Sequence, residues 1–559
     1  MTRSVQIVER MRWMSALAGA TVVAVALAIA LGATSGQIRL VPTSSAGAAQ
    51  AGGSSAPLDP RIAALAVHRP DTPVQAIVQF NAPVSPAKAD SDAAGVHGRV
   101  IGNLPIIHGL ALSLTAAQAR ALATNPDVHA VSLNTTVNTE SLPFHVTPRQ
   151  ALSAAQLQTT YDQTLGVLPL WKFGVTGTGV GVAVVDTGVD GALPDFATRN
   201  HSSSRVVASA VANADATTAT DSYGHGTDVA GIIAGNGDNR GQGDPLDGRY
   251  VGVAPNANLI SIKVSDETGK ASVLDVIYGL QFAVEHQSEF NIRVINLSLD
   301  STTPQSYKTD PLDAAVESVW MHGIVVVAAA GNLGNAANAV QFAPANDPYV
   351  ITVGGVDENG SANPTGDTIA TWSSRGTTQD GVQKPDVYAP GAHIVSVLAP
   401  NSVFATSCPT CVVGNGQYIQ TSGTSMAAPA ISGLVADLLQ IHPNWTPDQV
   451  KGDLTSSAVT ENNSFQEPNA LKAALLWNPA AADQGLTPSS LINTATGNIN
   501  YNLSSWSLSS WSRARGTLRA GFALSSWSCK DCTASGGAGA TPSLGSWSLG
   551  SWSTVQPLG

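Results

Sequence analysis

The chain has 559 residues, of which 43% are hydrophobic and only 12% are charged, with 53 glycines and 32 prolines. This length suggests several folding units, and the composition is typical of a turn-rich globular protein rather than a disordered one. The formal charge of −12 and the pI near 5.3 argue against nucleic acid as a partner, because phosphate binding requires clustered lysines and arginines.

The N-terminus carries Arg3, Arg10 and Arg12, and an almost uninterrupted apolar stretch follows over residues 14–33. This pattern is typical of an export signal. The stretch is also long enough to span a bilayer as a helix, so residues 1–35 are either a signal peptide or an N-terminal membrane anchor. Both alternatives place the rest of the chain outside the cell, because the arginines precede the apolar stretch. We therefore expect a protein that is secreted or held on the extracellular face of the membrane.

A spacer and a small domain are predicted next. Residues 36–60 are rich in Ser, Ala and Gly and lack periodicity, which favours a flexible spacer. Residues 61–140 mix alternating apolar runs with a short helical pattern, for which Thr115 is the expected N-cap. The predicted elements are strands at 74–80, 109–114 and 128–133 and a helix at 115–123. An α+β domain is the expected result.

Strand-like and helical patterns alternate over residues 161–480. Continuous Val/Ile runs, which suit buried parallel strands, occur at 181–185, 259–264, 294–298 and 324–330. Helical spacing occurs between and after them, at 271–285 and 310–323. A mainly parallel sheet between two helical layers is the natural solution for such a pattern. Functional residues of these α/β folds lie at the ends of the strands.

Four cysteines occur in two pairs, Cys408 with Cys411 and Cys529 with Cys532. The exported setting favours disulfides, and all three pairings of the four thiols stay open. A zinc site is the alternative, although the interval between the pairs is far longer than in zinc ribbons.

The C-terminal tail, residues 485–559, repeats the unit Ser-Trp-Ser. The repeats span 504–507, 509–512, 525–528, 545–548 and 550–553. Aromatic side chains in a Ser/Gly background can bind glycans, cell-wall polymer or another copy of the chain. The alternatives are a tail that wraps back onto the preceding domain and a disordered tail.

Three segments carry the residues of an acid–base–nucleophile set. An apolar strand runs into Asp186, and a carboxylate at a buried strand end can orient an imidazole. Asp-Thr-Gly also occurs in aspartic proteases, but a single copy does not make their dyad. His225 lies between glycines at the start of a small-residue helix, a place that favours the neutral base. Ser425 begins another helix, whose positive end would face a developing oxyanion while the hydroxyl reaches His225.

Two features resemble the subtilisin-like serine proteases (subtilases, peptidase family S8). They are the segment Ser-Gly-Thr-Ser-Met-Ala-Ala-Pro at residues 422–429 and the chain order Asp186, His225, Ser425. The resemblance extends to Asn332, which follows a strand and matches the family's side-chain oxyanion donor. It implies a three-layer subtilisin-like α/β fold and hydrolysis of peptide bonds through an acyl-enzyme, with Asp186, His225 and Ser425 as catalytic triad.

The resemblance also implies partners. Residues 61–140 resemble an inhibitor I9-like propeptide, an accessory domain being the alternative, so the chain would be a self-processing zymogen whose partners are its propeptide and protein or peptide substrates. The polar stretch at 135–165 would hold the processing site. Substrate would add as a strand along two edges. The residues of these edges are Ser298, Leu299 and Asp300, and Ala329, Ala330 and Gly331.

Two positions depart from the family pattern. Asp228 replaces a histidine beside the presumed base, and Asp300 replaces a glycine in the first edge, where it would narrow the pocket for the residue before the cut or favour basic side chains there. No cofactor is required for the chemistry. Structural calcium is possible on family grounds, in the oxygen-rich loop at 235–247, but no metal ligands can be assigned.

Two other functions are alternatives. A non-catalytic scaffold that binds through its Trp-rich tail, at a membrane or cell wall, would not need the complete catalytic set. A lipase or esterase would need a Gly-x-Ser-x-Gly elbow, which is absent around Ser425.

Overall fold

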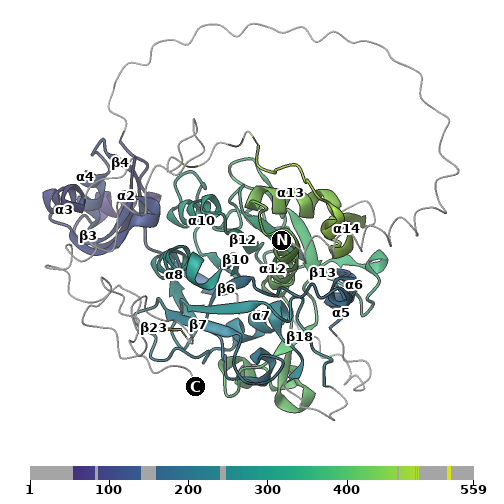
Figure 1. Ribbon diagram of the computed structural model, residues 1–559. Coiled ribbons are helices and arrows are strands. Elements are labelled where there is room, and N and C mark those ends of the chain that lie inside the picture. The colour runs from purple at the N-terminus through teal and green to yellow at the C-terminus, as the bar shows by residue number, and fades with distance from the viewer. Residues whose placement is uncertain are drawn as a thin grey trace, which may run out of the picture.

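The computed structural model describes residues 55–81, 86–139, 159–238, 247–461, 465–484, 486, 489 and 526–529. The predicted export segment, most of the spacer and nearly all of the Trp-rich tail lie outside these residues. The described residues form a small N-terminal domain beside a larger α/β domain (Figure 1).

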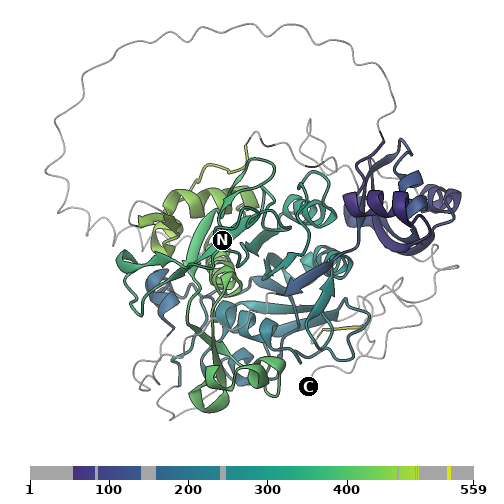
Figure 2. The same ribbon diagram turned by 180° about the vertical axis from the view of Figure 1, so that it is seen from behind.

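The N-terminal domain is a four-stranded antiparallel sheet covered by helices (Figure 2). Its strands lie in the order β2, β3, β1, β4. Thr115 caps α4 as predicted, since its hydroxyl accepts the Gln118 N–H and the Gln118 side chain accepts the Thr115 N–H. The elements in chain order are α2 (Pro60–His68), β1 (Pro73–Phe80), α3 (Pro86–Gly95), β2 (Arg99–Leu104), η1 (Pro105–Ile107), β3 (Gly109–Thr115), α4 (Ala116–Leu122) and β4 (Val128–Leu133).

The larger domain is built on a nine-stranded sheet whose central strands are parallel. The strand order is β14, β13, β12, β10, β6, β8, β7, β23, and β17 also pairs with β13. All four predicted parallel strands are present, and every residue of β6 is buried, as expected for a strand covered on both faces. The bounds are β6 (Gly181–Asp186), β7 (Val206–Val211), β8 (Asn258–Lys263), β10 (Ile292–Leu297), β12 (Val325–Ala329), β13 (Ile351–Asp357), β14 (Thr368–Ile369), β17 (Val387–Pro390) and β23 (Ser526–Cys529).

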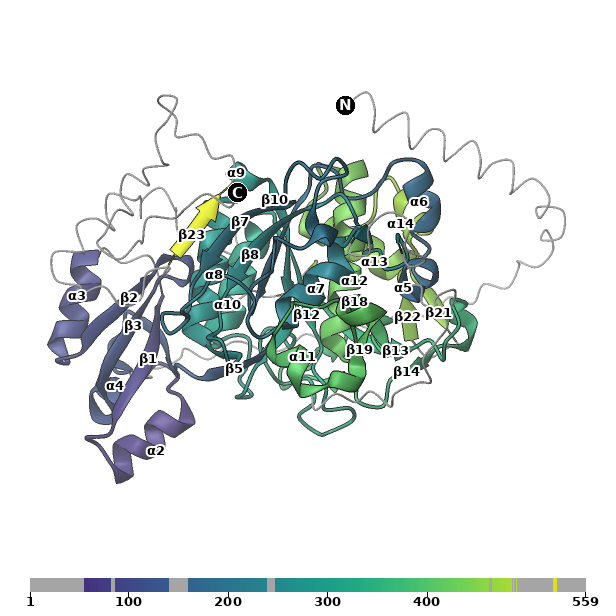
Figure 3. The same cartoon turned by 90° about the horizontal axis from the view of Figure 1, so that it is seen from below.

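Helices cover both faces of this sheet. In Figure 3, α8 (Val273–Glu285) and α10 (Pro311–Met321) lie on one side, and α7 (His225–Ala234) and α12 (Thr424–Ile441) lie on the other. The predicted helices at 271–285 and 310–323 are thus α8 and α10, capped by Ser272 and Asp310. The remaining helices are α5 (Thr160–Thr164), α6 (Leu168–Lys172), α9 (Gln287–Phe290), α11 (Val403–Ser407), α13 (Pro447–Ser457) and α14 (Ala470–Leu475).

Within the described residues, α12 is the one helix that is long and apolar enough to cross a membrane. However, 94% of it is buried inside the protein, so it is a core helix. Its buried position fixes the N-terminal turn, which carries Ser425, against the main sheet.

A separate three-stranded sheet joins the two domains. Strand β5 (Thr136–Thr139) follows the N-terminal domain and runs along the larger domain (Figure 3). It lies between β11 (Leu299–Ser301) and β9 (Lys270–Ser272) of the larger domain and is antiparallel to both. Val137 of β5 is 3% exposed and belongs to the hydrophobic core of the larger domain.

The small strands complete the larger domain. Strand β23 comes from the third Ser-Trp-Ser repeat and pairs with the edge strand β7, so this repeat lies back against the α/β domain, while the other four lie outside the described residues. The others are β15 (Gly376–Thr377), β16 (Gln383–Lys384), β18 (Ile394–Val397), β19 (Val412–Val413), β20 (Tyr418–Thr421), β21 (Val459–Glu461) and β22 (Phe465–Glu467).

Candidate active site

Asp186 ends the buried strand β6, and its carboxylate faces His225 at the start of α7. Asp186 Oδ1 accepts hydrogen bonds from His225 Nδ1 at 2.7 Å and from the Thr187 N–H at 2.7 Å. Both side chains of this pair are fully buried. The bond to Nδ1 fixes the ring so that Nε2 is the nitrogen able to accept a proton.

Glycines on both sides of His225 allow the helix to begin this close to the strand. Gly224 has a φ of 107°, which favours glycine, and a Cβ on it would lie 2.6 Å from Ser402 Oγ. A Cβ on Gly226 would lie 2.1 Å from the Gly188 carbonyl oxygen. The Gly-His-Gly sequence is therefore a packing requirement of the site.

Asp221 organises the same turn, a role that the sequence reasoning missed. Its Oδ1 accepts the Gly224 N–H at 2.7 Å and the Thr187 hydroxyl at 2.8 Å, and its Oδ2 accepts the Thr227 N–H at 2.8 Å. Thr187 Oγ1 in turn accepts the Gly226 N–H at 2.9 Å. An Asp shortly before a helix start is a known capping signal and could have been used to find it.

The surroundings of His225 change one expectation. Burial lowers the pKa of His225, but the charge and hydrogen bond of Asp186, helped by Asp228 and Asp221, outweigh burial and raise the pKa above its ordinary value. The helix start therefore does not set the pKa of this histidine by itself, because three carboxylates lie around the ring.

Ser425 lies in the first turn of α12 and is buried. Its Oγ donates a long hydrogen bond of 3.4 Å to the Ser298 carbonyl, and the Ser298 hydroxyl donates to the Ser425 carbonyl at 2.9 Å. The expected bond to His225 is not formed, because the hydroxyl is turned toward Ser298. His225 Nε2 is buried without a hydrogen-bond partner among the described residues. Triad geometry is often loose without substrate and closes by a side-chain rotation.

Asn332 follows β12 and is tied to the turn that carries Ser425. Its Oδ1 accepts the Thr424 N–H at 3.0 Å and the Thr424 hydroxyl at 3.3 Å. Thr424 Oγ1 also accepts the Gly331 N–H at 3.1 Å. Asn332 Nδ2 is buried with no acceptor among the described residues. The amide is thus held by its oxygen while its donor stays available.

The predicted first edge, Ser298 to Asp300, borders β5. Thr139 lies opposite Leu299, Asn138 opposite Asp300 and Val137 opposite Ser301. The other neighbour of β5 is β9, not the predicted second edge. Ala329 instead pairs with Val353 of β13, and the Ala330 N–H donates to the Val353 carbonyl. The backbone of the predicted second edge is therefore paired within the main sheet. Gly331 still borders the site, since a Cβ on it would lie 3.3 Å from Asp300 Oδ2.

Asp228 lies one turn after His225 and is fully buried. Its Oδ2 accepts the Thr421 hydroxyl at 2.9 Å, and Thr421 ends β20, the strand that leads into the Ser425 turn. Burial raises the pKa of Asp228 to about 7. Asp228 therefore connects the histidine helix to the serine turn and can change its charge near neutral pH.

Cys408 and Cys411 form a disulfide with each other. This bond rules out a zinc site that uses both of them as thiolates. The disulfide closes the segment after α11, whose Phe404 ring stands edge-on to His225, with ring centroids 5.7 Å apart. The side chains of Cys529 and Cys532 lie outside what the structure describes, so their pairing stays a prediction. Most of the loop predicted to bind calcium lies outside it as well. Among the described residues, no group of three or more acidic, His or Cys side chains could hold a metal.

Comparison with known proteins identifies this arrangement. Residues 177–509 match the model of the subtilase family, Peptidase_S8. Serine protease AprX of Bacillus subtilis (strain 168) is 38% identical over 300 residues, which are 53% of this chain and 64% of that protein. Subtilisin E of the same strain is 34% identical over 293 residues, which are 52% of this chain and 64% of that protein. Subtilisin of Bacillus pumilus is 35% identical over 293 residues, 52% of this chain and 88% of that protein.

A solved structure extends the similarity to the fold. Fervidolysin from Fervidobacterium pennivorans, described as a keratinolytic enzyme related to subtilisin, matches with a TM-score of 0.58 and 26% identity, over 77% of this chain and 64% of that one. The predicted three-layer α/β fold is thus confirmed. The matched family region contains Asp186, His225, Asn332 and Ser425. The chain belongs to the subtilase family.

Proposed function

We propose that the chain is a serine endopeptidase in which Asp186, His225 and Ser425 are the catalytic triad and Asn332 donates to the oxyanion. One observation carries the proposal. The buried Asp186–His225 bond of 2.7 Å leaves Nε2 as an unpartnered proton acceptor, and Asn332 Nδ2 is an unpartnered donor tied to the Ser425 turn. Buried polar atoms are normally paired, so two unpaired ones beside a nucleophile favour a site that substrate completes.

The steps follow from these atoms. Ser425 Oγ attacks the peptide carbonyl carbon while its proton passes to His225 Nε2, and Asp186 stabilises the imidazolium that forms. The carbonyl oxygen becomes an oxyanion that accepts N–H bonds from Asn332 and from the Ser425 backbone at the start of α12. His225 returns the proton to the leaving amine as the C–N bond breaks. A water molecule then releases the acyl group by the same steps in reverse order.

An assay of casein hydrolysis tests this proposal. It compares the purified chain with its Ser425→Ala variant. We expect turnover by the parent and none above background by the variant. Equal activity of the two proteins would contradict the proposal.

We further propose that residues 61–140 are a propeptide and that the chain processes itself. The N-terminal domain ends in β5, which lies between β9 and β11 as an added strand, an arrangement that supports a substrate-like segment. Strand β5 is antiparallel to β11, and its last residue, Thr139, lies opposite Leu299, the neighbour of Ser298, which is bonded to Ser425. We therefore propose that the cut falls between residues 140 and 141.

N-terminal sequencing of the chain tests self-processing. The parent should begin at Ser141, whereas Ser425→Ala should keep the N-terminal domain on the same chain. If Ser425→Ala were cut at the same bond, another protease would be making the cut. A parent that begins elsewhere would contradict the register.

Export is also proposed. The Cys408–Cys411 disulfide supports an oxidising compartment, as expected for a secreted or surface-held protein. Fractionation of cells, followed by sequencing of the largest exported form, separates a cleaved signal peptide from a retained anchor. A chain found only inside the cell would contradict export.

A further inference from the structure

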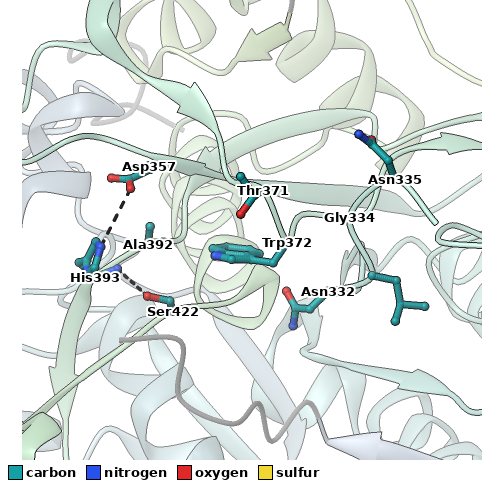
Figure 4. Close-up of a pocket in the computed structure, with 10 residues that line it drawn as sticks. Asn332, Gly334, Asn335, Asp357, Thr371, Trp372, Ala392, His393 and Ser422 are labelled. Atoms are coloured by element: carbon teal, nitrogen blue, oxygen red, sulfur yellow. Dashed lines mark hydrogen bonds and ion pairs between the residues drawn. The ribbon is translucent and has the colours of Figure 1, made fainter. Parts of the chain in front are cut away.

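A cavity of about 650 Å³ opens beside the candidate active site and has no part in the steps derived so far. Its lining includes Asn332 and Ser422, which flank the Ser425 turn, and also Trp372, Asp357 and His393 (Figure 4). None of its lining residues comes from β9 or β11. The cavity therefore borders the catalytic centre on a side that β5 does not occupy.

The direction of β5 shows which part of a substrate would reach this cavity. Strand β5 runs antiparallel to β11, so its C-terminal end points toward Ser298 and Ser425. A peptide that binds as β5 does brings the residues before the cut along β9 and β11. Its chain must then continue past Ser425 and Asn332, and Asn332 lines the cavity. The cavity is thus placed for a residue of the leaving group.

The shape of the cavity suits a long side chain. In Figure 4, Trp372 lies between Asn332 and the pair formed by Asp357 and His393. The indole has little room to move, because a Cβ on Gly355 would lie 2.5 Å from it and a Cβ on Gly391 would lie 3.2 Å from it. An alkyl stem can pack on such an indole, which also attracts a cation.

The far end of the cavity is acidic. Asp357 is held by the Asn359 N–H, which donates to its Oδ1 at 2.8 Å, and its Oδ2 lies 4.0 Å from His393 Nε2. His393 is fixed by its own N–H, which donates to Ser422 Oγ at 2.8 Å. Within the described part of the chain, no lysine or arginine lies within ion-pair distance of Asp357, whose side chain is 31% exposed. The far end of the cavity therefore offers a partly exposed carboxylate.

We infer that this cavity selects a lysine or arginine among the first residues after the scissile bond, with the stem on Trp372 and the charge at Asp357. The inference rests on the proposed peptidase function and makes Asp357 a specificity-determining residue of that reaction. Because the carboxylate is partly exposed, the preference should be moderate.

Quenched fluorescent peptides test the inference. They share one sequence before the cut and carry Lys, Gln or Glu at the first, second or third position after it. The self-processed protein is assayed at pH 8, where an ordinary histidine is neutral. At one of these positions we expect kcat/KM for Lys to exceed that for Glu about tenfold, which corresponds to about 1.4 kcal/mol.

Variants assign the preference to its residue. Asp357→Asn should reduce the Lys/Glu ratio to about twofold or less, and Asp357→Lys should reverse it. Glu289→Gln is the matched control, because Glu289 of α9 also faces a histidine, at 2.7 Å, but does not line the cavity, and it should keep the ratio. A ratio near one at all three positions, or a ratio unchanged by Asp357→Asn, would overturn the inference while leaving the peptidase function standing. A protein that cleaves no peptide would contradict the proposed function itself.

Discussion

The two halves of the candidate active site differ in how far their polar atoms are satisfied. Around the start of α7, side-chain oxygens of Asp186, Asp221 and Thr187 accept four backbone N–H groups, those of Thr187, Gly224, Gly226 and Thr227. The atoms left without a partner there among the described residues include the proton acceptor His225 Nε2 and Asp186 Oδ2. Around Ser425, by contrast, Asn332 Nδ2 has no acceptor and the hydroxyl makes only a long bond. One half is therefore organised before substrate binds, and the other is left for substrate to complete. Changes to the first half should cost stability, and changes to the second should cost activity alone.

The largest effect is expected for His225→Ala, which removes the proton acceptor that both halves share. The turnover number for a peptide should fall by about 10⁴–10⁶-fold, because residues of a triad act as a unit. Steady-state kinetics measure this loss. The double variant with Ser425→Ala should be no slower than His225→Ala by itself, and additive losses would show that the two residues act independently.

Asn332→Leu isolates the unsatisfied half. Loss of one oxyanion donor should lower kcat by about 10²–10³-fold with little change in KM, the range known for this donor in subtilisin. Thr424→Val removes a hydroxyl that holds Asn332 and should cost less, about tenfold. If Asn332→Leu raised KM and left kcat unchanged, the amide would only bind substrate, and its role as oxyanion donor would be contradicted.

Asp221→Ala tests the satisfied half. It leaves the buried N–H groups of Gly224 and Thr227 and the Thr187 hydroxyl without their acceptor, so the free energy of unfolding should fall by about 2–4 kcal/mol. Urea denaturation of the Ser425→Ala background, which cannot digest itself, measures the change. Asp221→Asn keeps one acceptor oxygen and should lose less. Equal stability of all three proteins would refute the role given to Asp221.

A substitution of Asp228 should have a smaller effect, on the pH profile of kcat/KM. His225 must be neutral to accept a proton, so kcat/KM falls as the pH drops through the His225 pKa, which is raised above its ordinary value. Asp228, whose pKa is about 7, adds negative charge as the pH rises and helps to raise the His225 pKa. Asp228→Asn removes that charge and should move the acid limb of the profile to lower pH. A shift to higher pH would contradict this coupling.

Asp300→Gly should have the smallest effect. The Asp300 carboxylate lies beside Gly331, at the border of the site, where it can favour a basic residue before the cut. Relative kcat/KM for peptides with Arg, Leu or Phe at that position should shift away from Arg by about two- to fivefold. Unchanged ratios would remove Asp300 from the determinants of specificity.

The sequence predicted what depends on neighbours along the chain. Apolar runs predicted β6 and β12, at whose ends Asp186 and Asn332 lie, and the Thr115 cap was found from residue type alone. The family motif around Ser425 then indicated the nucleophile. These signals are short-range, and the structure places these elements where they were predicted.

What the sequence could not predict depends on distant partners. Lys270–Ser272 has no apolar alternation, so nothing indicated that β9 would be the second neighbour of β5. The contact of Phe404 with His225 and the approach of Asp357 to His393 join segments far apart in sequence. The hydroxyl direction of Ser425 is set by the Ser298 carbonyl, which only the fold brings near.

The central claim is that His225, oriented by Asp186, activates Ser425. A fluorophosphonate reacts covalently with activated serines, and mass spectrometry locates the adduct. The account predicts a single adduct on the peptide that contains Ser425, formed quickly by the parent and at least a thousandfold more slowly by His225→Ala. An adduct on another serine, or equal labelling of Ser425 in the two proteins, would contradict it.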